Sequence, residues 1–195
     1  AAIQKKALPL MDIYREDQAA AFRAFLASDA RSAGARTRLL ASPPISTLRE
    51  ETLRAMLAAR DLPPADCRRI LEHAAAQRDR METVLAHSPV SYAFPALTRG
   101  EFEQYPPALP LSEMFFDRNL RYTYAEYCRH AEETQAFAAA HSGYTVRPCD
   151  AAFRNISIAV RAGEWALVSK NGSPAIHFVI RYPKLRGAIE AFLGG

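Results

Sequence analysis

The residues that could carry chemistry do not have the spacing that a metal site needs. Cys128 and His130 lie two positions apart in a run with a helical pattern, so their side chains point to different faces and cannot bind one metal ion. His130 and His141 are eleven positions apart, whereas two ligands on one helix prefer a spacing of four. We therefore predict no metal ligands in this chain.

Catalytic pairs have no better support in the sequence. Glu132 and Glu133 are adjacent, so their carboxylates diverge on a helix and suit a solvated face better than paired acid and base work. Ser169 and Lys170 resemble a nucleophile and its base in type only, because Lys170 falls at a predicted turn where water surrounds it. The sequence also lacks the nucleophile-elbow, zinc-hydrolase, phosphate-loop and dinucleotide-binding motifs. It predicts no catalytic residue, no cofactor and no enzyme.

Three apolar runs near the C-terminus predict a three-stranded antiparallel meander, followed by a helix. The runs cover residues 154–160, 164–169 and 175–181. Asn171-Gly172, between the second and third runs, is typical of a two-residue type I′ turn, because both central residues of that turn have positive φ. This turn places Lys170 opposite Ser173 and fixes the pairing of the two strands.

A second turn at Ala162-Gly163 gives the register of the first two runs. Counting from both turns places Trp165 opposite Phe178 on one side and opposite Val160 on the other. Side chains alternate across a strand, so these bulky groups share one face of the meander. We expect that face to be the core.

His177 is the ionisable side chain of most interest, and this register places it on the other face, between Ala159 and Ala166. That face carries small, half-apolar side chains, so it is covered by a second layer or lines a shallow pit. We predict that it meets a small ligand, a second copy of the chain or a covering segment. The simpler alternative is a histidine that is hydrogen-bonded beneath a helix or half exposed. The candidate ligand or interface residues are Ala159, Ala166, Val168, His177 and Val179.

The composition is that of an ordinary globular protein. The chain has 195 residues, of which 49% are hydrophobic, and this is enough for a real core. Its net charge is +4, but the arginines are scattered among acidic residues, so we expect no direct binding of nucleic acid. No apolar run is long enough to cross a membrane and no signal peptide opens the chain, which predicts a cytoplasmic protein. Cys67, Cys128 and Cys149 have neither disulfide nor zinc spacing.

The rest of the chain alternates between helical runs and connections. Helical periodicity covers residues 19–27, 47–59, 65–86 and 123–141, and short strands are expected at 90–94 and 144–148. Residues 28–44 are small and polar and are typical of a connection. Residues 95–121 are rich in proline and aromatic side chains, and long connections of this kind often cover a pocket.

Two stretches carry a resemblance to a known family. They are LREETLRAMLAARDLPPADCRRILEHAAAQRDRMETVL, and YTVRP with the later run FRNISIAVRAGEWALVSKNGSPAIHFVIRYPKLRGAIEAF. Together they span residues 46–193 and resemble the C-terminal, non-DNA-binding domains of bacterial helix-turn-helix transcriptional regulators of the Cro and xenobiotic-response-element type. The resemblance implies a C-terminal domain that senses a signal or mediates assembly, while a separate N-terminal module binds DNA.

These observations predict an α+β protein with an antiparallel sheet of about five strands, which ends in the C-terminal meander and has helices mainly on the Trp165 face. We expect residues 1–45 to form a helical segment and a connection, and residues 46–195 to form the effector-type domain. The resemblance implies a regulatory domain with a small-molecule effector and a homo-oligomeric state, with DNA bound only through a separate N-terminal domain. The alternative is a small-molecule enzyme that uses residues 95–121 as a lid.

Overall fold

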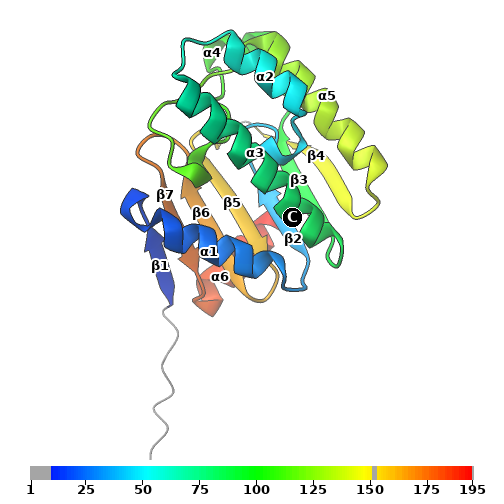
Figure 1. Ribbon diagram of the computed structural model, residues 1–195. Helices are drawn as coiled ribbons and strands as arrows, with labels where there is room; N and C mark the ends of the chain where they lie inside the picture. The colour runs from blue at the N-terminus through cyan, green and yellow to red at the C-terminus, as the bar shows by residue number, and fades with distance from the viewer. Residues whose placement is uncertain (1–9, 151–152, 195) are drawn as a thin grey trace, which may run out of the picture.

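A computed structural model describes residues 10–150 and 153–194, and within them one mixed sheet of seven strands organises the fold (Figure 1). The strand order is β1-β7-β6-β5-β2-β3-β4. The strands are β1 (Met11–Tyr14), β2 (Arg36–Leu39), β3 (Val90–Pro95), β4 (Tyr144–Cys149), β5 (Ile156–Arg161), β6 (Trp165–Lys170) and β7 (Ile176–Ile180). The helices are α1 (Ala19–Ala30), α2 (Glu50–Ala58), α3 (Pro64–Leu85), α4 (Arg99–Gln104), α5 (Tyr124–Ala140) and α6 (Pro183–Gly194), with short 3-10 helices η1 (Glu16–Gln18), η2 (Ile45–Thr47) and η3 (Ser112–Met114).

The predicted antiparallel sheet of about five strands is wrong. The described residues contain a sheet of seven strands, and β3 pairs in parallel with both β2 and β4. Parallel neighbours need long crossover connections, usually helical. Here α2 and α3 connect β2 to β3, and α4 and α5 connect β3 to β4. The C-terminal part β5-β6-β7 is an antiparallel meander, as the apolar runs indicate.

Two strands lie in the part of the chain where the sequence predicts only a helix and a connection. β1 pairs with β7 at one edge of the sheet, whereas β2 lies in its middle, between β5 and β3. The sequence of β2 is Arg-Thr-Arg-Leu, which has the polarity of a connection. Its two arginines lie on a face of the sheet that other elements cover, whereas arginine side chains are mostly exposed in proteins.

The predicted two-residue turn at Asn171-Gly172 is also wrong. A five-residue loop separates β6 from β7, and Lys170 pairs with Ile176 instead of Ser173. The partner of Lys170 therefore shifts by three positions. Because side chains alternate along a strand, an odd shift turns every side chain of β7 to the opposite face of the sheet.

The first hairpin of the meander differs from the prediction by one position. Trp165 pairs with Arg161 and not with Val160. Trp165 and Phe178 now lie on opposite faces, because the partner of Phe178 is three residues beyond Trp165 on β6. We call the face that carries Trp165 the α1 face and the opposite one the α6 face, after the helices that pack on them.

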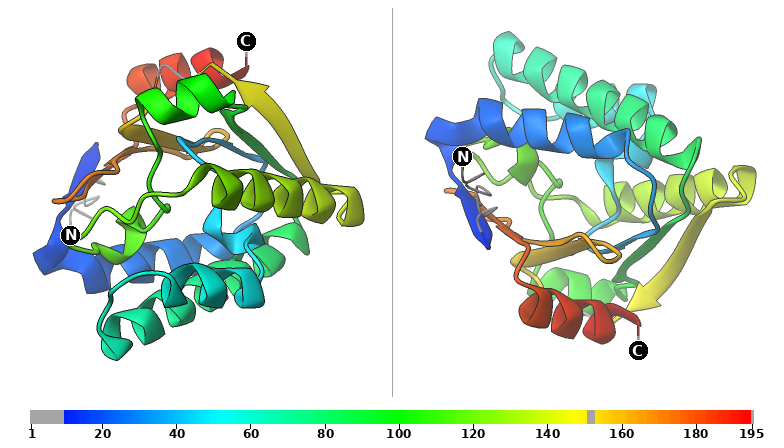
Figure 2. Two further views of the ribbon diagram at one scale, coloured as in Figure 1. Left: turned by 90° about the horizontal axis from the view of Figure 1, so that it is seen from above. Right: turned by 90° about the horizontal axis from the view of Figure 1, so that it is seen from below.

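The two faces are covered by unequal helical layers (Figure 2). Helix α6 packs on one face of the sheet, whereas α1, α2 and α3 lie on the side of the other face. Ala159, Val179 and His177 belong to the α1 face, and Ala166 and Val168 belong to the α6 face. The predicted row of Ala159, Ala166 and His177 is therefore divided between the two faces, and the register shift is the cause.

The two glycines of the meander provide a matched test of this register. Gly163 has φ +77, a conformation that costs other residues about 1 kcal/mol or more. Gly172 does not have positive φ, and a Cβ added there meets no atom within 4 Å. We expect Gly163→Ala to lower the free energy of unfolding in urea by about 1 kcal/mol and Gly172→Ala to leave it unchanged. If Gly172→Ala lowered the free energy of unfolding more than Gly163→Ala does, the result would support the two-residue turn at Asn171-Gly172 instead.

A charged cluster is buried on the α1 face beside Trp165. Asp29, near the end of α1, forms ion pairs with Arg36 at 3.2 Å and with Arg161 at 2.9 Å. The Trp165 indole Nε1 donates a hydrogen bond of 2.7 Å to the same carboxylate. The three partners come from β2, β5 and β6, so this one carboxylate fastens α1 to three neighbouring strands.

Candidate functional site

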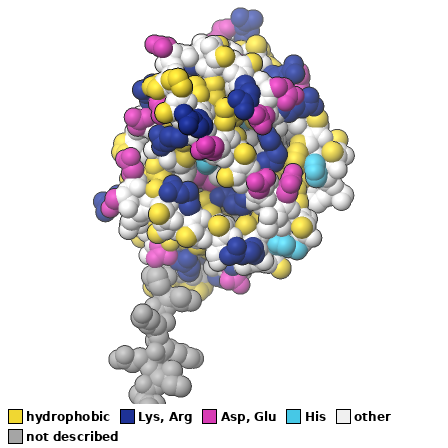
Figure 3. All heavy atoms as spheres, in the orientation of Figure 1, with side chains coloured by type: hydrophobic (Ala, Val, Ile, Leu, Met, Phe, Trp, Pro, Cys, Tyr) yellow, Lys and Arg dark blue, Asp and Glu magenta, His cyan; other side chains and the backbone are white. Residues whose placement is uncertain are grey.

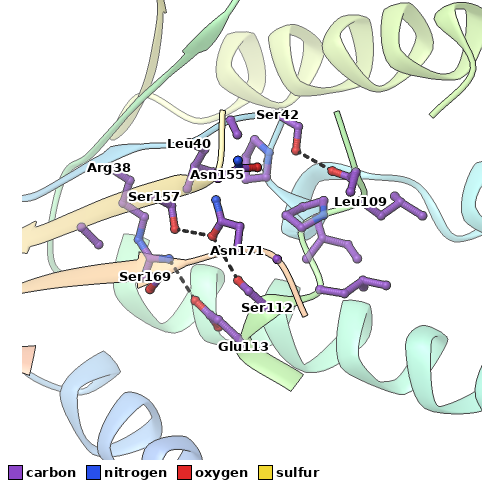
Figure 4. Close-up of a pocket in the computed structure, with 18 of the residues that line it drawn as sticks. Arg38, Leu40, Ser42, Leu109, Ser112, Glu113, Asn155, Ser157, Ser169 and Asn171 are labelled. Carbon is purple, nitrogen blue, oxygen red and sulfur yellow. Dashed lines mark hydrogen bonds and ion pairs between the residues drawn. The ribbon is translucent and has the colours of Figure 1, made fainter. Parts of the chain in front are cut away.

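A cavity of about 110 Å³ lies on the α1 face of the sheet, beyond the end of the layer that α1 covers. Its walls are the sheet, helix α3 with η2, and the segment of residues 105–121, which carries η3. Figure 4 shows polar side chains from the sheet, from the loop after β6 and from the 105–121 segment around this space. We call it the polar cavity.

The sheet supplies the polar floor of the cavity. Arg38 of β2 lies between Tyr92 of β3 and Ala159 of β5 in the register, so the three side chains share one face. Ser157 and Ser169 form a pair on the adjoining strands β5 and β6. Alternation along the strands therefore brings groups from four neighbouring strands to one place on the sheet.

The loop after β6 and the 105–121 segment close one side of the cavity. Asn171 accepts hydrogen bonds through its Oδ1 from Ser157 at 2.9 Å and from Ser112 at 3.4 Å (Figure 4). At the mouth, the Tyr105 ring contacts the guanidinium groups of Arg121 and Arg154, whose central carbons lie 5.3 and 5.0 Å from the ring centroid. The mouth is therefore positively charged.

Glu113 of η3 is the acidic residue of the lining, and hydrogen bonds from α3 hold its carboxylate in place. Its carboxylate accepts hydrogen bonds from Gln77 at 2.6 Å and from Arg80 at 2.5 Å, both on α3. Burial by itself would raise the pKa of Glu113, but the charges of Arg80 and Arg38 outweigh burial and hold this pKa well below its usual range. Glu113 is therefore ionised at neutral pH and is not a candidate proton donor.

Arg38 is held much less tightly than Glu113. Its nearest carboxylate oxygen is that of Glu113 at 3.6 Å, beyond hydrogen-bond distance. The guanidinium lies near the Tyr92 ring, with 5.8 Å between its central carbon and the ring centroid. Only 14% of the side chain is exposed, and it donates no hydrogen bond to any residue in the described part of the chain. A nearly buried guanidinium thus keeps unused donors that face the cavity.

Two further polar atoms of the lining have no partner among residues 10–150 and 153–194. They are the Oγ of Ser46, a residue that is 4% exposed, and the Nε2 of His73. Burial lowers the pKa of His73 to about 4, because the charged imidazolium loses its hydration. At neutral pH the His73 ring is therefore uncharged. It can donate or accept one hydrogen bond at Nε2.

The structure places His177, the predicted site residue, behind the cavity lining. The ring is fully buried and stacks on Phe22 of α1, with 4.2 Å between the ring centroids. Its Nε2 donates to the Ser112 carbonyl at 3.0 Å, so its Nδ1 accepts from the Ser169 hydroxyl at 2.7 Å. Burial also lowers the pKa of His177. His177 therefore fastens η3 to the sheet in its neutral form.

The other predicted ligand or interface residues are not brought together. Ala159 lines the polar cavity. Val179 is buried under α1 on the same face, and Ala166 is buried under α6 on the opposite face. Val168 is half-buried and packs beneath α6. The residues with open hydrogen-bonding capacity are Arg38, Ser46 and His73, and none of them is among the site residues predicted from the sequence.

Two findings concern metal ligands and membrane-spanning helices in the described residues. In residues 10–150 and 153–194, no group of three or more histidine, cysteine, aspartate and glutamate side chains is placed to hold a metal ion. His130 is buried, with its two ring nitrogens hydrogen-bonded to the Tyr122 hydroxyl at 2.8 Å and the Pro44 carbonyl at 3.0 Å. The described helices also include none with the length and apolarity to cross a membrane.

The surface of the helical side carries mixed charge. Figure 3 shows lysine and arginine side chains interspersed with aspartate and glutamate on this view of the described residues. Exposed ion pairs such as Arg54 with Glu50 on α2 belong to this pattern.

No protein-family model, curated protein or solved structure matches this chain. The resemblance of residues 46–193 to Cro-type regulators therefore stays a prediction. The function has to be argued from the polar cavity and the side chains that line it.

Proposed function

We propose that this chain is a signal-sensing regulatory domain and that the polar cavity binds its small-molecule ligand. The observation that supports this best is the presence, in one cavity, of three side chains with unused hydrogen-bonding capacity: Arg38, Ser46 and His73. Buried polar groups nearly always have partners. Several such groups around one space indicate that a bound molecule completes them.

The position of the cavity suits a sensor. Arg38 lies on the sheet, Ser46 on η2 and His73 on α3, so one ligand can bridge the sheet and the helical layer. A ligand shifts a conformational equilibrium only by its difference in affinity for the two states. Because the proposed ligand binds both layers at once, it favours the arrangement in which they are held together.

The size of the cavity limits the ligand to a small molecule. A volume of about 110 Å³ is below the engineered cavity of about 150 Å³ that admits benzene, and it exceeds the roughly 10 to 15 Å³ that a cavity needs to hold one water molecule. The ligand therefore has few non-hydrogen atoms, or part of it extends through the mouth beside Tyr105. A nucleic acid or a folded partner does not fit this space.

The resemblance to bacterial regulators supplies the proposed context. In this proposal the ligand is the effector, and DNA is bound through a separate N-terminal domain. We also propose a homo-oligomeric state, since regulators of this kind bind repeated half-sites as symmetric assemblies. The resemblance supports this role but names no ligand.

An enzyme is the second candidate, and His73 is the observation that favours it. A neutral imidazole with a free Nε2 beside an arginine could take a proton from a bound substrate, and the 105–121 segment would act as the lid. A base whose pKa is about 4 is weak at neutral pH, however, and Glu113 is fixed by Arg80. The geometry therefore supports binding better than catalysis.

Fragment screening by NMR tests the proposal. We expect small polar fragments, neutral and charged, to shift the backbone amide signals of Ser46, Tyr92 and Asn171. Ser157→Phe fills the cavity from the sheet and should abolish these shifts. Shifts confined to residues outside the cavity, or shifts that survive in Ser157→Phe, would refute the ligand site. Chemical conversion of a bound fragment would instead favour the alternative that the protein is an enzyme.

A further inference from the structure

The charges of the polar cavity indicate the class of its ligand. Its lining contains three arginines, Arg38, Arg121 and Arg154, and one carboxylate, Glu113, which gives a net charge of +2 with His73 neutral. Two of the arginines surround the mouth and the third lies inside. A concave site with this charge attracts anions and excludes cations.

Arg38 is the group that an anion would meet inside the cavity. Its guanidinium has a charge partner in Glu113, but the 3.6 Å separation leaves its N–H donors without an acceptor in the described residues. Glu113 cannot move closer without weakening its hydrogen bonds to Arg80 and Gln77. A planar guanidinium with free donors matches the two oxygens of a carboxylate in a bidentate pair.

Neutral donors add to this recognition. The Ser46 hydroxyl has no partner, and the Asn171 Nδ2 donates to no described residue, since its Oδ1 makes the hydrogen bonds that fix the side chain. Figure 4 shows Asn171 in the centre of the lining, between the 105–121 segment and the sheet. These groups suit further oxygen atoms on the ligand.

We propose that the ligand of the polar cavity is a small monocarboxylate whose carboxylate pairs with Arg38 and whose remaining oxygen atoms accept hydrogen bonds from Ser46 and Asn171. This inference rests on the proposed ligand site. A phosphate-type dianion fits less well, because Glu113 lies close to Arg38 and would repel the second negative charge. One interior guanidinium matches one carboxylate charge.

A matched set of small probes tests the carboxylate. The probes are pyruvate, its neutral isostere pyruvamide, and methylphosphonate, each titrated to about 20 mM because so few atoms give weak binding. We expect pyruvate to shift the signals of Ser46 and Asn171 with an affinity at least about tenfold higher than either competitor, as a charge-assisted bidentate contact implies.

Two variants should change pyruvate affinity in opposite directions. Arg38→Gln should weaken binding by about tenfold or more and remove the preference over pyruvamide. Glu113→Gln should strengthen it, because the competing anion beside Arg38 is lost. Arg38→Lys keeps the charge without the planar fork and should bind with intermediate affinity. Arg54→Gln, an exposed site on α2, has the same charge change as Arg38→Gln and should bind pyruvate as the natural protein does.

The outcomes separate this inference from the proposed function. The carboxylate proposal would be overturned if pyruvate and pyruvamide bound equally well. It would also be overturned if Arg38→Gln and Arg38→Lys bound pyruvate with the affinity of the natural protein. If only neutral fragments shifted the NMR signals of the lining residues, the carboxylate proposal would be wrong but the ligand site would stand. Absence of any shift in the lining, with pyruvate or with the fragments, would refute both.

Discussion

Replacing Asp29 with alanine is expected to lower the free energy of unfolding by about 3 to 5 kcal/mol. The substitution leaves the guanidinium groups of Arg36 and Arg161 without their common carboxylate, and it removes the acceptor of the Trp165 indole. Arg36 is only 3% exposed, so water cannot replace the lost partner. Removing one member of a buried ion pair is far more costly than removing both.

Urea denaturation of two further variants gives this prediction its controls. Asp29→Asn keeps an oxygen acceptor for Trp165 and should lose less than Asp29→Ala. Glu50→Ala breaks an ion pair with Arg54 in which the side chains are 57% and 60% exposed, so it should change the free energy of unfolding by less than about 0.5 kcal/mol. Equal, small effects for Asp29→Ala and Glu50→Ala would show that the cluster does not fasten α1 to the sheet.

Trp165→Ala is expected to have an effect of similar size, about 3 to 5 kcal/mol. Trp165 is 3% exposed and lies in the cluster under α1, where its ring meets that of Phe25 edge to face at 5.6 Å. Removing the indole opens a cavity between α1 and the sheet and also leaves Asp29 short of one donor. Both losses act on the same contact between α1 and the sheet.

Trp165→Phe separates the two contributions, because it keeps an aromatic ring and removes the hydrogen bond to Asp29. We expect it to cost about 1 to 3 kcal/mol, the range for losing a hydrogen bond to a charged group and leaving a smaller ring. A melting midpoint for Trp165→Ala close to that of the natural protein would contradict the assignment of this residue to the core. The order of the two variants in urea denaturation is the decisive comparison.

The sequence predicts the elements of this fold better than their arrangement. The five predicted strands are present, because alternation and β-branched residues report local structure directly. The Asn171-Gly172 signal misplaced the register, because a longer loop with Pro174 competes with the two-residue turn. Strand pairing depends on contacts between residues that are distant in the sequence. The parallel pairing of β2 and β4 with β3 therefore has no local sequence signal apart from the helices that connect these strands.

The candidate site was largely hidden from sequence reasoning for a related reason. Arg36 and Arg38 alternate along β2, and alternating arginines normally indicate a solvated face of a strand. Here Arg36 is neutralised by Asp29 of α1, seven positions earlier in the chain, but Arg38 lies beside Glu113 of η3, which is far away in the sequence. The proline-rich and aromatic character of residues 95–121 did indicate a covering segment, and residues 105–121 line the cavity.

The central claim is that the polar cavity binds a small ligand through Arg38, and a crystal structure of the protein soaked with the tightest-binding probe tests it most directly. We predict electron density for the probe between the sheet and the 105–121 segment, with two of its oxygen atoms about 2.7 to 2.9 Å from the Arg38 guanidinium nitrogens. Density for the probe only at other sites, or an Arg38 guanidinium that instead closes onto Glu113 while the cavity holds ordered water alone, would contradict the account.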